Sequence, residues 1–104
     1  MAIDPEDILL EEGPSKGRYV YRVGGDEAMM TFSKAGAHLI IIDHTEVPGA
    51  FRGQGVGPAL VARGVADARA AGKKIVPLCP FAAAQFRRHA EWADVLQQRK
   101  GAAS

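Results

Sequence analysis

The first half of the chain alternates apolar and polar positions with the two-residue period of β-strands. A short apolar run at residues 8–10 is followed by a turn-forming stretch at 13–17. Residues 18–23 and 27–33 alternate in phase on either side of Gly24-Gly25-Asp26, a sequence typical of a hairpin connection. These segments predict antiparallel strands joined by tight turns.

The next segment, residues 37–47, is longer and is centred on a continuous aliphatic run at 39–42. Such a run is typical of a strand that is buried on both faces. Together with the preceding segments, it predicts a meander of three or four antiparallel strands.

The period changes to that of helices after Pro48-Gly49. Residues 58–71 repeat apolar side chains at helical spacing, and Gly72 is a typical helix end. Residues 74–79 predict a short strand, and residues 81–92 a second helix with its aromatic side chains in the core. A strand, a helix and a strand in succession imply a right-handed crossover and a parallel pair. The predicted fold class is α/β with a mixed α+β sheet: an antiparallel meander followed by strand, loop, helix, strand and helix.

Length and composition indicate one ordinary domain. The 104 residues, 47% hydrophobic and 24% charged, suffice for a core without disulfides or a structural metal. We expect a single domain over residues 1–104, with 1–7 and 97–104 flexible. The lone cysteine, Cys79, and three widely spaced histidines form no zinc-ligand pattern. Because neither a secretory leader nor a membrane-spanning run is evident, we expect a reduced, cytoplasmic protein without a membrane partner.

Charge is unevenly distributed despite a formal net charge of +1. Residues 1–30 carry seven acidic and three basic side chains, whereas residues 51–104 carry nine basic and three acidic ones. An anionic ligand is therefore expected to prefer the C-terminal half. The basic residues are spread over two predicted helices without interleaved aromatic residues, which disfavours nucleic acid as a partner.

Candidate chemistry centres on a glycine-rich loop at residues 47–58, between a predicted strand and a predicted helix. Such a loop lets backbone N–H groups converge on an anion at the helix N-terminus. A dinucleotide-binding G-x-G-x-x-G does not fit, because Pro58 and Leu60 occupy the positions of its third glycine. A nucleoside triphosphate loop does not fit either, because no lysine follows these glycines at the required place. What remains is Arg52-x-x-Gly55-x-Gly57, a tight turn that admits a pyrophosphate.

This motif resembles the acyl-CoA-binding signature of the GNAT superfamily of acetyltransferases. More narrowly, residues 44–47, 52–57 and 77–81 together resemble a branch of very small, cysteine-containing GNAT proteins, and the resemblance runs from about residue 19 to 92. It implies a minimal GNAT fold that uses acetyl-CoA, with the coenzyme A pyrophosphate on the loop and the pantetheine arm along residues 46–47. The implied cofactor-binding residues are Val47, Arg52, Gly53, Gln54, Gly55, Val56 and Gly57.

The loop alone cannot provide tight binding. A helix N-terminus favours an anion by about 0.3–1 kcal/mol at an exposed site, whereas micromolar affinity needs about 8 kcal/mol. The basic side chains of Lys73, Arg87 and Arg88 are candidates to reach the nucleotide end of the cofactor.

Acetyl transfer to an amine needs a base, donors for the oxyanion and an acid for the departing thiolate. On a regular strand, His44 and Glu46 fall on the same face, so either can serve as the base, directly or through water. The alternative is a structural role for each, as a strand-end histidine and a loop-entry carboxylate. By the resemblance, a backbone N–H near Val47 is the oxyanion donor.

Cys79 is the third catalytic candidate. It follows a predicted parallel strand and precedes a helix whose N-terminus lowers the pKa of a thiol. It can accept the acetyl group as a nucleophile or protonate the leaving thiolate; the alternative is an inert buried thiol. The usual GNAT acid is a tyrosine on the last helix, but Tyr19 and Tyr21 both lie early in this chain. Cys79 or water would therefore replace it.

The predicted function is transfer of an acetyl group from acetyl-CoA to an unidentified amine on a small molecule or protein, directly or through an acetyl-cysteine. Larger GNAT enzymes have helices between their first two strands, but only three residues separate Val23 from Glu27, which implies a reduced or open acceptor pocket. An acyl-CoA-binding or sensing module without turnover is therefore the alternative. An interaction protein with an acidic N-terminal surface is a third hypothesis. We expect a monomer or a weak homodimer.

Overall fold

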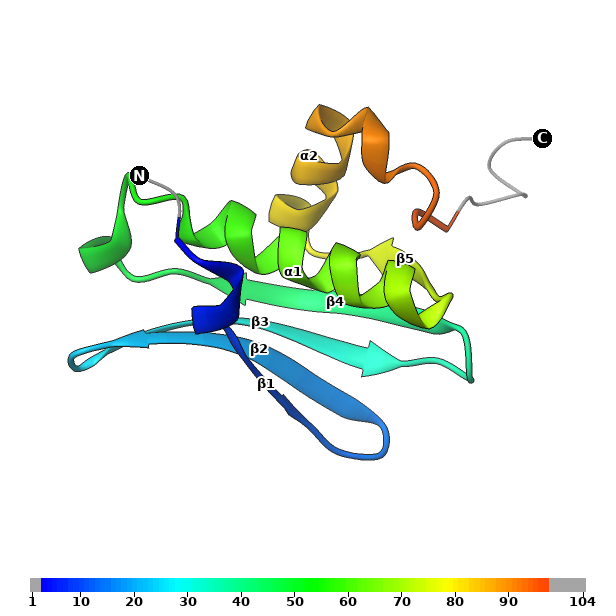
Figure 1. The fold of residues 1–104 in the computed structure, drawn as a ribbon, viewed down its shortest axis with the longest axis horizontal. Helices are drawn as coiled ribbons and strands as arrows, with labels where there is room; N and C mark the ends of the chain where they lie inside the picture. Colours follow the sequence, from blue (N-terminus) through cyan, green and yellow to red (C-terminus); the bar gives the residue numbers. More distant parts are fainter. Residues whose placement is uncertain (1–2, 98–104) are drawn as a thin grey trace.

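The first four strands form an antiparallel meander, as the alternation in the first half predicts. The computed structural model describes residues 3–97. The sheet has the order β1-β2-β3-β4-β5 (Figure 1). Its strands are β1 (Leu9–Glu12), β2 (Lys16–Val23), β3 (Asp26–Lys34), β4 (Leu39–Glu46) and β5 (Lys74–Pro77). β4 and β5 are parallel, so the predicted crossover and fold class are confirmed.

Two helices follow the meander. α1 (Val56–Ala71) connects β4 to β5, and α2 (Pro80–Arg88) follows β5. Short 3-10 helices lie at Pro5–Asp7, Gly49–Phe51 and Ala90–Trp92. Within the described residues, no helix has both the length and the apolar character needed to cross a membrane.

The helix boundaries differ from the predicted ones for local reasons. α1 begins at Val56 rather than at 58, because Gly55 adopts a left-handed conformation with φ 75° and starts the helix there. It ends as predicted at Gly72, whose φ is 71° and whose N–H donates to the carbonyl of Arg69. α2 ends before 92, because His89 leaves the helical region with ψ 82°.

Both helices lie on the same side of the sheet, where α1 runs along β4 in the opposite direction and α2 stands beyond it (Figure 1). The core fills the space between this face and α1, with buried side chains such as Met30, Phe32 and Leu60. No helix of residues 3–97 covers the opposite face. The prediction that residues 39–42 are buried on both faces is therefore wrong: Ile42 is 1% exposed, but Ile41 on the uncovered face is only half-buried.

Ion pairs cover part of this open face. Arg18 and Arg22 each contact both Glu11 and Glu27, at N–O distances between 2.8 and 3.3 Å. Val20, between the two arginines on the same face, is completely buried. The side chains of this network thus replace a covering helix over β1, β2 and β3.

The ends of the described chain are tied to the domain. Ile3 packs against the core and Pro5–Asp7 form a 3-10 helix. The flexibility expected of residues 1–7 stays a prediction. At the other end, the N–H of Gln97 donates to the carbonyl of Ile75 at 2.9 Å. The expectation of flexibility for 1–2 and 98–104 falls outside the described residues.

Gly17 provides a test of the packing between β1, β2 and β3. A Cβ atom at this position would lie 2.5 Å from the Cζ atom of Phe32 and 2.9 Å from the Cβ atom of Glu12. The ring of Phe32 is buried, so making room for the added carbon disturbs its packing. We expect Gly17→Ala to lower the free energy of unfolding by about 1–3 kcal/mol, measured by chemical denaturation.

The matched control is Gly25→Ala in the β2–β3 turn, where a Cβ atom would meet nothing within 4 Å. This control should change the free energy of unfolding by less than about 0.5 kcal/mol. Equal stabilities of the two variants would contradict the packing described here.

Candidate active site

The loop between β4 and α1 needs glycine at two positions because its backbone is left-handed there. Gly53 and Gly55 have φ values of 79° and 75°, in the left-handed region that ordinary side chains rarely adopt. The loop borders a hollow of about 200 Å³. The hollow is lined by Val47, Phe51, Arg52, Gly53, Gly55, Val56, Gly57, Pro58 and Phe81. Six of the seven predicted cofactor-binding residues therefore lie together around one concave surface.

Gln54, the seventh, does not line this hollow. Its side-chain Nε2 donates to the carbonyl of Ala50 at 3.1 Å. Its backbone N–H donates to the carbonyl of Phe51 at 3.1 Å. Gln54 therefore holds the loop in shape through local hydrogen bonds.

The N-terminus of α1 opens at this hollow without a capping side chain. The N–H groups of Val56 and Gly57 belong to the first helical turn, which has no acceptor within the helix. Arg52 is exposed beside them and makes no ion pair within residues 3–97. Unpaired amides, the helix dipole and a free guanidinium together make this end of α1 suitable for a phosphate group.

Phe81 joins the starts of the two helices. We predicted it to be a core residue, but it is 36% exposed and its ring packs on Gly57. A Cβ atom at position 57 would lie 2.7 Å from a ring carbon. Gly57 is thus needed for close packing as well as for access to the helix N-terminus, a role that the sequence alone does not reveal.

The parallel pair of β4 and β5 stops before β4 ends. The last paired residues are Ile42 and Pro77, whereas β4 continues to Glu46. The N–H groups of Leu78 and Cys79 both donate to the carbonyl of Ile42 at 3.1 Å. Within the described chain, residues 43–46 therefore have no neighbouring strand on this side, and their backbone faces the start of α2.

Cys79 lies at this point, immediately before the first turn of α2. Its side chain is 5% exposed, and its Sγ atom forms a hydrogen bond with Oγ1 of Thr45 at 3.5 Å. Burial raises the pKa of the thiol, but the hydroxyl of Thr45 and the amides of Phe81 and Ala82 outweigh it and hold the pKa below its usual range. No side chain caps α2 by a hydrogen bond, so the amides of its first turn remain available to the sulfur.

His44 and Glu46 lie on one face of β4, as the strand period predicts. Their Nε2 and Oε2 atoms are 3.7 Å apart, and the side chains are 63% and 65% exposed. They pair across the sheet with Thr31 and Met29, on the open face. Because neighbouring residues of a strand point to opposite faces, Thr45 points toward the helices, where it contacts Cys79. The structure therefore separates the three catalytic candidates into an exposed pair and a buried thiol.

Lys73 is not near the predicted nucleotide end of the cofactor. It follows the C-terminus of α1, a helix of 16 residues that is about 24 Å long at 1.5 Å per residue. The glycine loop lies at the other end of the same helix.

Arg87 and Arg88 are exposed in the last turn of α2. Among residues 3–97, no three His, Cys, Asp or Glu side chains are grouped so as to hold a metal ion.

Comparison with known proteins identifies one matching family and a similar solved structure. A family model described as GCN5-related N-acetyl-transferase matches residues 18–95. The solution NMR structure of a GCN5-like candidate N-acetyltransferase from Staphylococcus aureus matches with a TM-score of 0.66 and 28% sequence identity. That match covers 89% of this chain and 91% of the other. No protein of curated function matches the sequence.

The hydrogen bond between Thr45 and Cys79 leads to a prediction about pH. It favours the thiolate, so replacing the hydroxyl by a methyl group in Thr45→Val should raise the pKa of Cys79. The thiolate would then form at higher pH than in the original protein. The measurement is the ultraviolet absorbance of the thiolate across a pH titration, with the spectrum of Cys79→Ala subtracted.

Thr31→Val is the matched control, because the hydroxyl of Thr31 bonds to the carbonyl of His44 rather than to the thiol. This control should leave the titration midpoint unchanged. An unchanged midpoint in Thr45→Val, or an equal change in both variants, would show that Thr45 does not set the pKa of Cys79.

Proposed function

The chain belongs to the GCN5-related N-acetyltransferase family, and from this premise we propose that it transfers the acetyl group of acetyl-CoA to an amine. One observation carries the proposal. The hollow beside Arg52, the uncapped start of α1 and the thiol of Cys79 meet beside the unpaired edge of β4. Donor binding and acyl transfer thus have suitable groups within one region. The acceptor is an amine of a small molecule or a protein.

The donor fits this region in two parts. Its phosphates would be held by the N–H groups of Val56 and Gly57 and by the guanidinium of Arg52. Its pantetheine arm would bind along the unpaired backbone of β4 towards Val47, adding an extended segment to the sheet. The amides and Arg52 attract the negative charge of the phosphates, and the strand edge forms hydrogen bonds with the pantetheine arm. Together these groups account for more affinity than the helix N-terminus alone.

Acyl transfer through Cys79 is the mechanism that the thiol environment supports. The lowered pKa increases the thiolate fraction near neutral pH. The sulfur attacks the thioester carbonyl, a bond from Sγ to the acetyl carbon forms, and the bond from that carbon to the sulfur of coenzyme A breaks. Coenzyme A leaves as a thiolate and takes up a proton from solvent, while the N–H of Val47 stabilises the oxyanion. Attack by the amine then releases the Cys79 thiolate.

His44 and Glu46 act on the acceptor amine. They are exposed on the face of the sheet that carries no helix, next to the point where β4 and β5 part. An ammonium group that approaches from this face would meet them before it reaches the acetyl group. The pair can remove its proton, directly or through water, and thereby produce the nucleophilic amine.

A second candidate function is acyl-CoA binding or sensing without turnover. The observation in its favour is that short turns connect β1 to β2 and β2 to β3, with only residues 13–15 and Gly24-Gly25 between the strands. No helix of the described chain is present there to enclose an acceptor. The cytoplasmic location and the monomer or weak homodimer expected from the sequence remain predictions.

Arg52 provides a test of donor binding. Replacing it by glutamine removes the charge from the loop, and we expect acetyl-CoA to bind about tenfold more weakly because one charged hydrogen bond is lost. Isothermal titration calorimetry measures this affinity. Arg22→Gln, on the open face, is the control and should bind as the original protein does. Unchanged affinity in Arg52→Gln would show that the loop does not hold the phosphates.

Cys79 provides a test of acyl transfer. Incubation with acetyl-CoA followed by intact mass spectrometry should give a single acetyl adduct on the original protein and none on Cys79→Ala. Addition of a panel of amines should discharge the adduct, and His44→Gln with Glu46→Gln should slow this discharge about 10²-fold or more. Turnover without an adduct in both proteins would favour direct transfer. Binding with neither adduct nor turnover would favour the sensing function.

A further inference from the structure

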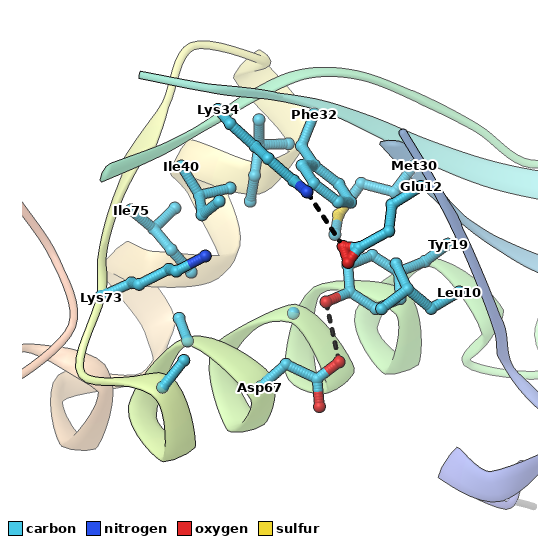
Figure 2. A pocket seen from close by; sticks show the side chains of 14 residues that line it. Leu10, Glu12, Tyr19, Met30, Phe32, Lys34, Ile40, Asp67, Lys73 and Ile75 are labelled. Atoms are coloured by element: carbon cyan, nitrogen blue, oxygen red, sulfur yellow. Dashed lines mark hydrogen bonds and ion pairs between the residues drawn. The ribbon is translucent and has the colours of Figure 1, made fainter. Parts of the chain in front are cut away.

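A second hollow lies beneath the C-terminal half of α1, at the opposite end of this helix from the glycine loop. It occupies about 200 Å³ between α1 and the sheet (Figure 2). Its walls are mainly apolar and include Met30, Phe32, Ile40, Ile42, Ala68 and Ile75. None of the seven predicted cofactor-binding residues at positions 47 and 52–57 lines it, whereas Lys73 does.

The space exists because α1 presents small residues over this part of the sheet. Gly64, Ala68 and Ala71 follow one another on the side of α1 that lines the hollow. Gly64 closes the inner end, since a Cβ atom there would lie 3.0 Å from the terminal carbon of Met30. Leu10 and Ala71 are exposed, so the hollow reaches solvent at this end of the helix.

The acidic groups of the hollow are already neutralised. The carboxylate of Glu12 contacts Nζ of Lys34 at 3.2 Å. Asp67 accepts a hydrogen bond from the hydroxyl of Tyr19 at 2.8 Å (Figure 2). It also pairs with Arg63 at 3.2 Å. These contacts leave no acidic group of the lining available for a cationic ligand.

Lys73 is the fourth charged side chain of the lining, after Glu12, Lys34 and Asp67. Its side chain is half-buried, and Figure 2 shows its ammonium directed into the hollow from the side opposite Glu12. It makes no ion pair within the part of the chain that the structure describes. The hollow therefore combines apolar walls with one uncompensated positive charge, which suits an anionic group on an apolar body.

We propose that this hollow binds a small carboxylic acid with a compact apolar body, its carboxylate paired with Lys73 and its body packed against Met30, Phe32 and Ile40. A protein cavity of about 150 Å³ accommodates a benzene ring, so 200 Å³ suits a ring or short chain with one carboxylate. A phosphorylated ligand fits less well, because a single lysine and apolar walls would leave most of its oxygens without partners. The site is independent of the acetyl-CoA assignment.

Benzoate is a suitable probe, with benzyl alcohol as its uncharged counterpart of similar size. Each is titrated into the full chain while backbone amide shifts are followed by NMR. We expect saturable benzoate shifts at Gly64, Ala68, Ala71 and Lys73, and we expect benzyl alcohol to bind about fivefold more weakly than benzoate. Equal affinities, no saturable shift, or shifts confined to residues 52–57 would each overturn the proposal.

Two variants complete the test. Lys73→Met keeps a side chain of similar length without the charge, so benzoate should lose its advantage over benzyl alcohol. Ala68→Leu fills the hollow and should abolish binding of both probes; Ala71→Leu, at the exposed mouth, replaces it if Ala68→Leu does not fold. Retained benzoate preference in Lys73→Met, or unchanged binding in the filled variant, would overturn the proposal.

Discussion

The turn from β5 into α2 is the constraint on which the candidate site depends. A single carbonyl, that of Ile42, accepts hydrogen bonds from the N–H groups of both Leu78 and Cys79. These two bonds end the pairing of β4 with β5 while β4 continues to Glu46. The chain consequently enters α2 beside an unpaired strand edge, with Cys79 against Thr45 and Phe81 against Gly57. The free edge, the activated thiol and the contact between the helix starts all follow from this local departure from the sheet.

Two helix N-termini meet there, and each acts on a different negative charge. The start of α1 has free amides and Arg52 beside a hollow, which suits a phosphate. The start of α2 acts on the sulfur of Cys79, where its amides and the hydroxyl of Thr45 outweigh the effect of burial on the pKa. Each contribution is small by itself, since an exposed helix end stabilises a charge by about 0.3–1 kcal/mol. In the proposed function, their proximity lets one sheet edge bind the anionic donor and present the thiol to it.

The one-sided cover of the sheet has consequences at both faces. On the open face, Arg18 and Arg22 with Glu11 and Glu27 cover Val20, and exposed ion pairs of this kind contribute little to stability, typically about 0–1 kcal/mol each. On the covered face, α1 packs against β2, β3, β4 and β5, and α2 packs against β4 and β5. The N-terminal half of α1 meets the core through Leu60 and Val61, whereas the small residues of its C-terminal half leave a hollow. The two ends of one helix therefore present different charged groups beside their hollows: free backbone amides with Arg52 at the start, and a single free lysine at the end.

The sequence by itself determined the strands of the meander, both helices, the crossover, the glycine loop and the family, because each depends on short-range backbone geometry or on a local motif. It also placed His44 and Glu46 on one face, since the period of a strand is fixed. Only the tertiary structure decided that Cys79 lies on the other side of β4 with Thr45 and that Phe81 packs on Gly57. These relations join residues that are distant in the sequence, and they depend on where β5 leaves β4 and on which face the helices cover. No periodicity in the chain encodes the point where β5 leaves β4 or the face that the helices cover. Both are set by packing between elements rather than within them.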